Sequence, residues 1–266
     1  MAVSKGCSNG DAMASSLLQI DRLTKRFGGV VAADAITLDI PPGECHAVIG
    51  PNGAGKTTLV GLLAGEIAPQ EGTIRFERSD ITRLPVHRRS RLGLARSFQI
   101  SSLFSDFTAL ENVALATQAH RGHSFRFWRD ARREDGLRKP AHAALARVGL
   151  AARANVRVDR MSHGERRQLE IAMALATKPR MLLLDEPMAG MGPEESAQMV
   201  ETLRQLKGTM TILLIEHDMD AVFALADRIT VLVYGRVIAS DRPAAIKTDA
   251  AVRQAYLGEK ESSGHD

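Results

Sequence analysis

The sequence predicts an α/β protein, in which a parallel sheet covered by helices follows a strand-rich segment and is interrupted by a helical insertion. Short apolar segments at 181–185 and 211–216 alternate with amphipathic helical runs, which is typical of parallel strands covered on both faces. Alternating apolar positions at 17–27 and 35–40 predict half-buried strands ahead of this core. Residues 100–160 have helical periodicity and few strand-like segments, so we expect them to be the insertion.

The remaining segments follow the same pattern along the chain. Residues 45–50 are short and apolar, as expected of a buried strand, and 56–67 are helix-like. The run 165–178 has apolar residues on one face and predicts an amphipathic helix. The other predicted elements are a turn followed by a strand within 70–76, a helix at 193–207 that Gly208 stops, a helix near 218–226 and a hairpin at 228–240 that turns at Gly235.

The composition is that of a soluble globular protein. The chain has 266 residues, of which 44% are hydrophobic and 25% charged, and a net charge of +4. Residues 1–16 lack the apolar core of a signal peptide and predict a disordered lead-in. No segment approaches the roughly 18 consecutive apolar residues of a membrane span, so work at a membrane would require another chain. Cys7 and Cys45 are far apart and are expected to be reduced thiols.

Residues 50–57, GPNGAGKT, fit the phosphate-binding pattern G-x-x-x-x-G-K-[ST] between a predicted strand and a predicted helix. Glycines allow backbone N–H groups to approach phosphates, and the helix N-terminus adds partial positive charge. Lys56 is expected to reach the β- and γ-phosphates, and the Thr57 hydroxyl to ligate Mg²⁺. The predicted nucleotide-binding residues are Gly50, Pro51, Asn52, Gly53, Ala54, Gly55, Lys56, Thr57 and Thr58.

Two acidic residues follow the apolar strand at 181–184. Asp185 comes at the strand's end, where a P-loop protein needs a second carboxylate for Mg²⁺, held through water. The adjacent Glu186 is placed to polarise an attacking water molecule. The alternative is that both acids start a solvated loop before Pro187, and the P-loop upstream argues against it.

The segment MSHGERRQ at 161–168 admits two interpretations. Ser162 and Glu165 have the S-x-x-E spacing of a helix capping box. With Gly164 they also form a helix N-terminus that carries a hydroxyl and a glycine, which suits a second phosphate-binding site.

In this combination of motifs the chain resembles the ATP-binding cassette (ABC) ATPases, the motor subunits of ABC transporters, over roughly residues 17–258. The resemblance implies a P-loop NTPase (RecA-like) core, an N-terminal antiparallel β subdomain and a helical subdomain inserted at about 100–178, followed by a polar tail at 259–266. MSHGE resembles the family signature L-S-G-G-Q. His163 departs from the first glycine of that signature, and Gly192 replaces the usual Asp of the family's D-loop, the segment AGMG.

Three further residues receive roles from the resemblance. Phe27 resembles the aromatic residue that stacks on adenine, with a core phenylalanine as the alternative. Gln99 matches the glutamine that senses Mg²⁺ and the attacking water, and a surface glutamine is the alternative. His217 resembles the histidine that contacts the γ-phosphate and orients Glu186, and a hydrogen-bonded histidine at a strand end is the alternative. The implied catalytic residues are Glu186, His217 and Gln99, with Thr57, Gln99 and Asp185 at Mg²⁺.

The resemblance also implies partners. Two ATPase chains, identical or different, would pack head to tail so that each signature covers the other's ATP. LARSFQISSLF, LLIEHDM and the terminal AYLGE resemble uptake systems for branched-chain amino acids and related substrates. Such a chain sits peripherally on the cytoplasmic face of the inner membrane. It would contact integral-membrane permeases directly and an extracytoplasmic substrate-binding protein indirectly.

The main alternative is a soluble ABC-type ATPase that acts on nucleic acid or ribosomes, and a third is a P-loop kinase or GTPase. The chain has one cassette and no sustained heptad pattern, which disfavours the ATPase that acts on nucleic acid or ribosomes. The ordered combination of motifs disfavours the kinase or GTPase. The basic stretches 87–96 and 121–133 are interpreted as solvated surface, so no nucleic-acid partner is expected. Export rather than uptake stays open.

Overall fold

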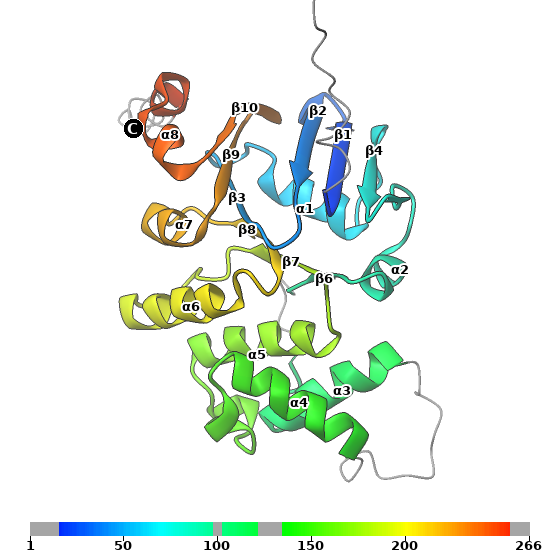
Figure 1. The fold of residues 1–266 in the computed structure, drawn as a ribbon, viewed down its shortest axis with the longest axis vertical. Coiled ribbons are helices and arrows are strands. Elements are labelled where there is room, and N and C mark those ends of the chain that lie inside the picture. The colour runs from blue at the N-terminus through cyan, green and yellow to red at the C-terminus, as the bar shows by residue number, and fades with distance from the viewer. Residues whose placement is uncertain (1–15, 98–102, 122–134, 256–266) are drawn as a thin grey trace, which may run out of the picture.

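The computed structural model describes residues 16–97, 103–121 and 135–255. Gln99, the stretch 122–133 and the terminal AYLGE lie wholly or largely outside these ranges. Within them the strands form two sheets, of four strands in the order β2-β1-β4-β5 and of six in the order β10-β9-β3-β8-β7-β6 (Figure 1). The strands are β1 Leu18–Phe27, β2 Val30–Ile40, β3 Cys45–Ile49, β4 Glu71–Phe76, β5 Ser79–Asp80, β6 Leu94–Arg96, β7 Met181–Asp185, β8 Thr211–Ile215, β9 Arg228–Val233 and β10 Arg236–Asp241.

The pairing confirms the predicted fold class. Strands β3, β6, β7, β8 and β9 pair in parallel, whereas β1 pairs with β2 and β4 in antiparallel fashion. All residues of β3, β7 and β8 are buried, as expected of mainly apolar central strands, and the buried residues include the polar His46, Asp185 and Thr211. β9 and β10 form the predicted hairpin, and its two turn residues, Tyr234 and Gly235, have φ angles of 47° and 77°. Two consecutive left-handed residues are the geometry of a tight two-residue hairpin turn.

The helices divide into those beside the sheets and those of the insertion. They are α1 Lys56–Ala64, α2 Val86–Arg91, α3 Ala109–Arg121, α4 Asp135–Arg147, α5 His163–Ala176, α6 Pro193–Leu206, α7 Met219–Leu225 and α8 Pro243–Thr248. Figure 1 shows α3, α4 and α5 grouped at one end of the molecule, away from the antiparallel sheet. Val113, Leu145 and Leu169 are fully buried in one apolar cluster, which continues into β7 and β8. The inserted helices therefore share a core with the parallel sheet.

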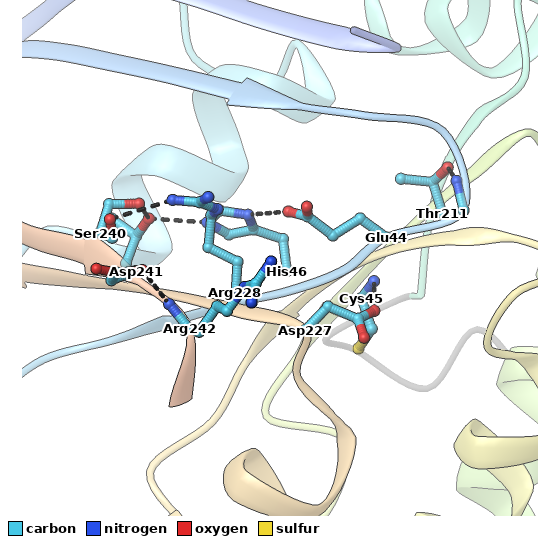
Figure 2. Close-up of polar contacts among 11 residues, drawn as sticks. Glu44, Cys45, His46, Thr211, Asp227, Arg228, Ser240, Asp241 and Arg242 are labelled. Carbon is cyan, nitrogen blue, oxygen red and sulfur yellow. Dashed lines mark hydrogen bonds and ion pairs between the residues drawn. The ribbon is translucent and has the colours of Figure 1, made fainter. Parts of the chain in front are cut away.

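A polar network holds the amino ends of the parallel strands (Figure 2). The fully buried His46 ring lies 2.6 Å from Glu44 Oε1 through Nδ1 and 2.8 Å from Thr230 Oγ1 through Nε2. The Thr230 hydroxyl is 2.8 Å from that of Ser240, which links β3 to the β9–β10 hairpin. Cys45, the first residue of β3, is also buried, and burial raises the pKa of its thiol to about 12, so the thiol stays protonated. Both ring nitrogens of His46 and the hydroxyls of Thr230 and Ser240 have partners, which makes the burial of these groups tolerable.

Two predictions are corrected by the structure. Helix α1 ends at Ala64 rather than 67, because Gly65 adopts a φ of 86° and its N–H bonds to the Gly61 carbonyl. The basic stretch 87–96 is not a uniformly solvated face. Arg89 is 1% exposed, and Leu94 and Ala95 are buried in β6.

The buried Arg89 joins α2 to the end of α1. Its guanidinium donates to the carbonyls of Leu62 and Leu63 at 2.7 Å, of Leu84 at 2.8 Å and of Thr82 at 3.0 Å. Burial lowers the pKa of Arg89 to about 10, which leaves it charged at neutral pH. The sequence pattern missed this role because one buried arginine lies among several exposed ones.

We expect Arg89→Leu to lower the free energy of unfolding by about 3 kcal/mol, because several buried carbonyls lose a charged donor. The matched control is Arg88→Leu on the exposed side of the same helix, with an expected change within about 0.5 kcal/mol. Urea unfolding of both variants measures the difference. Equal effects of the two substitutions would show that Arg89 has no special structural role.

Candidate nucleotide-binding site

The loop between β3 and α1 requires glycine at both ends. Gly50 and Gly55 have φ angles of 153° and 100°. A Cβ atom at Gly50 would lie 2.1 Å from the Leu232 carbonyl oxygen, and one at Gly55 would lie 2.1 Å from that of Ala32. Gly55 is also the N-cap of α1 and supplies no side-chain hydrogen bond to its first turn. The backbone N–H groups of that turn are thus presented without a side chain in the way, as a phosphate site needs.

Lys56 places its charge inside this loop. Its Nζ donates to the carbonyls of Gly50 at 2.6 Å and Pro51 at 2.9 Å, and the residue is only 8% exposed. Thr57, which follows it, is exposed. Of the other predicted binding residues, Asn52 and Gly53 are exposed, Ala54 is buried, and Pro51 and Thr58 are half-buried. The loop therefore combines a fixed ammonium group with accessible backbone and hydroxyl groups.

Asp185 ends β7 at the same edge of the sheet as the loop, since β8 pairs in parallel with both β3 and β7. It is 4% exposed, and its Oδ2 accepts from Arg96 Nη2 at 3.0 Å. Burial raises the pKa of Asp185, and Arg96 opposes that rise. Arg96 also contacts Glu66 beyond α1. Arg96 was not singled out from the sequence, because nothing in the strand segment LAR marks it as a partner of a distant acid.

Glu186 and His217 meet at the ends of β7 and β8. His217 Nδ1 lies 3.9 Å from Glu186 Oε1 and also 3.9 Å from Glu216 Oε2. Glu186 has a φ of 47°, which is strained for a residue with a side chain, and its N–H donates to the Ile215 carbonyl at 2.9 Å. Both side chains remain accessible, with 42% of the Glu186 side chain and 66% of the His217 side chain exposed. The arrangement aims an acid and an imidazole at the same solvent-facing edge.

Glu216 was not predicted from the sequence to contribute to the site. It is 1% exposed, and its carboxylate accepts from the N–H groups of Met188 at 2.9 Å and His217 at 3.1 Å. Burial raises the pKa of Glu216, and these hydrogen bonds oppose that rise. Its contacts connect the segment after β7 to the residue that carries the imidazole. The only sequence signal was its place in LLIEHD.

The predicted capping box at 162–165 is present. The Ser162 hydroxyl accepts from the Glu165 N–H at 3.2 Å, and the Glu165 carboxylate accepts from the Ser162 N–H at 2.9 Å. His163 Nε2 lies 3.2 Å from the Ala189 carbonyl oxygen, so this nitrogen is the donor. A carboxylate from α6, that of Glu195, also reaches this helix start. Figure 1 places α5 among the inserted helices, whereas α1 lies beside the antiparallel sheet.

Phe27 ends β1 and is 49% exposed, which excludes the core alternative for this residue. Its ring lies 5.2 Å from Lys25 Nζ. Gln99 lies outside the described residues. Across the described ranges, no helix combines the length and the apolar character needed to cross a membrane.

The fold and the site together define a P-loop nucleotide-binding protein with an inserted helical unit. The family described as "ABC transporter" matches residues 33–189, and the one described as "Branched-chain amino acid ATP-binding cassette transporter" matches residues 236–262. The chain is 37% identical over 254 residues to the high-affinity branched-chain amino acid transport ATP-binding protein BraF of Pseudomonas aeruginosa, over 93% of this chain and 100% of the relative. It is 37% identical over 259 residues to LivG of Escherichia coli, a protein of the same description, with the same coverage.

The solved structures agree. An ATP-binding cassette of an ABC transporter, MJ1267 in its ADP conformation, matches with a TM-score of 0.81 and 27% identity, over 91% of this chain and 99% of that one. The chain belongs to the ATP-binding subunits of ABC transporters, in the branched-chain amino acid group, and is therefore an ATPase.

We expect Gly55→Ala to lower the free energy of unfolding by at least about 2 kcal/mol more than Gly53→Ala. Both residues have positive φ angles, of 100° and 77°, and so share a backbone cost of about 1–2 kcal/mol. Only the Gly55 substitution also meets a carbonyl oxygen, because nothing lies within 4 Å of a Cβ at Gly53. Urea unfolding measures the difference, and equal losses would show that the close approach to Ala32 is not a constraint.

Proposed function

We propose that this chain is the ATP-binding and hydrolysing subunit of an ABC importer that powers uptake of branched-chain amino acids or related small substrates through separate permease subunits. The glycine-restricted loop beside Lys56 lies at the same edge of the sheet as Asp185, which ends β7, and Glu186, which follows it, and this arrangement is the observation that carries the ATPase chemistry. The family match at residues 236–262, and the names of the two curated relatives, support the substrate class.

The residues present suit Mg²⁺–ATP. The backbone N–H groups of the non-proline residues of 50–58 and the Lys56 ammonium would bind the phosphates, and the exposed Phe27 would stack on adenine. The Thr57 hydroxyl and the Asp185 carboxylate are hard oxygen ligands of the kind that Mg²⁺ prefers, and Gln99 is the third proposed ligand. When bound, the ion neutralises charge on the β- and γ-phosphates.

Hydrolysis is assigned to the acid and the imidazole at the sheet edge. Glu186 accepts a proton from the attacking water, and His217 orients Glu186 and contacts the γ-phosphate. Gln99 completes the proposed catalytic set. The strained backbone at Glu186 supports this role, since such strain concentrates at functional sites.

A second ATPase chain, identical or a sister, would complete each site. The Ser162, Gly164 and Glu165 segment of one chain would cover the ATP held by the other. ATP then bridges the two chains, and hydrolysis removes the charge that holds them together. The permeases bind this pair at the cytoplasmic face of the inner membrane, and an extracytoplasmic binding protein delivers the substrate. We also propose one ABC ATPase domain at 17–258, with the helical subdomain at about 100–178, a lead-in at 1–16 and a tail at 259–266.

We expect Glu186→Gln to retain ATP, to lose turnover by roughly 100-fold or more and to accumulate as an ATP-bound dimer, because general-base catalysis is removed while the phosphate contacts remain. Lys56→Ala is the contrasting control and should lose nucleotide binding itself. Steady-state hydrolysis, equilibrium binding and analytical sizing distinguish the two variants. Normal turnover by Glu186→Gln would contradict the general-base assignment.

In cells that lack this gene, we expect uptake of labelled leucine to fall to background. Expression of the natural chain should restore uptake, whereas expression of the Lys56→Ala variant should not, because transport needs the bound nucleotide. Labelled isoleucine and valine test the breadth of the substrate class, and a sugar taken up by another system is the control. Unchanged leucine, isoleucine and valine uptake would contradict the proposed substrate class.

A further inference from the structure

The start of α5 is already occupied by an anion from the same chain. One oxygen of Glu195, Oε1, accepts from the Ser162 hydroxyl at 2.8 Å and from the Gly164 N–H at 3.1 Å. These hydrogen bonds hold the pKa of Glu195 below its ordinary value, so the carboxylate is charged at neutral pH. A negative oxygen is therefore bound by a hydroxyl, a backbone N–H and a helix N-terminus together.

The position of Glu195 follows from the local fold. Helix α6 begins with Pro193 after the N-cap Gly192, which places Glu195 in its first turn, close to the start of α5. Gly164 permits the approach, because a Cβ at that residue would lie 2.9 Å from Glu195 Oε1. The contact between His163 Nε2 and the Ala189 carbonyl joins the same two segments a second time.

The donors that hold Glu195 are the ones that the proposed function assigns to ATP of the partner chain. Ser162 and Gly164 cannot give the same hydroxyl hydrogen and the same N–H to two anions at full strength. Two negative groups at one helix start would also repel each other. Binding of the partner's nucleotide and the contact with Glu195 are thus mutually exclusive states of this helix start.

We propose that Glu195 is a built-in competitor for the signature: its carboxylate occupies Ser162 and Gly164 until the γ-phosphate of the partner's ATP displaces it. The inference rests on the proposed function and adds a regulatory contact to the same site. The competition raises the ATP concentration needed to close the dimer. After phosphate leaves, Glu195 returns to the same donors and favours the open state.

A purely structural role for Glu195 predicts the opposite result. If the carboxylate served only to join the starts of α5 and α6, its loss would misplace the signature and weaken closure. The direction of the change in ATP dependence therefore separates competition from positioning.

The test compares full-length variants in the Glu186→Gln background, in which turnover is blocked. Dimer formation, with itself or with a co-purifying sister chain, is followed by analytical ultracentrifugation against ATP concentration. Glu195→Gln should lower the half-maximal ATP concentration about tenfold, because a neutral acceptor binds these donors less strongly than a carboxylate. Glu194→Gln removes the same charge from an exposed position one residue away and should shift it less than about twofold.

Glu195→Asp provides a second variant that keeps the charge but shortens the side chain. It should also lower the half-maximal ATP concentration, which attributes the effect to the contact rather than to net charge. An unchanged or raised value for both Glu195 variants would overturn the proposal. No dimer in the Glu186→Gln parent would instead overturn the proposed function on which it rests.

Discussion

The close approach of backbone to backbone around the phosphate loop is the constraint on which the rest of this structure depends. Gly50 abuts the Leu232 carbonyl and Gly55 abuts that of Ala32, so the loop is wedged between the β9–β10 hairpin and β2. Gly235 reinforces the junction: its N–H donates to the Ala54 carbonyl, and its carbonyl accepts from the Asp34 N–H, each at 2.9 Å. One small region therefore fixes the antiparallel sheet, the parallel sheet and the first helix relative to the loop.

Two buried acids, Asp185 and Glu216, lie at the same edge of the parallel sheet as this loop. Asp185 and Glu216 are buried at the ends of neighbouring strands, where burial alone disfavours their charged forms. Arg96 offsets the cost of burying Asp185, and backbone N–H groups offset the cost of burying Glu216, so hydrogen bonds hold both carboxyl groups in place. Glu186 and His217 stay exposed beside them. Buried acids thus position the edge, while the exposed pair remains available for chemistry.

The inserted helices contact the rest of the chain through a polar junction as well as through shared apolar packing. The start of α5 meets the segment between β7 and α6 through His163 and Glu195. These are polar, partly exposed contacts, which exchange more easily than buried apolar ones. Under the proposed competition, a junction of this kind would let the helical unit exchange contacts, whereas the apolar cluster that includes Val113 and Leu182 keeps the unit attached.

Local patterns in the chain were sufficient to predict the parallel core, the hairpin at Gly235, the capping box of α5 and the glycine-rich loop at 50–57, because periodicity and short-range spacing are local properties. They did not reveal the short elements α2, β5, β6 and α8. The burial of Arg89, the pairing of Arg96 with Asp185 and the support that Glu216 gives to the His217 segment became visible in the folded chain alone, since each contact joins residues or surfaces that no local pattern relates. Glu195 shows the reason most clearly. In the sequence it is one of two acids in the first turn of α6, and it accepts hydrogen bonds from Ser162 and Gly164 only because folding brings two helix starts, 31 positions apart at the nearest pair, into contact.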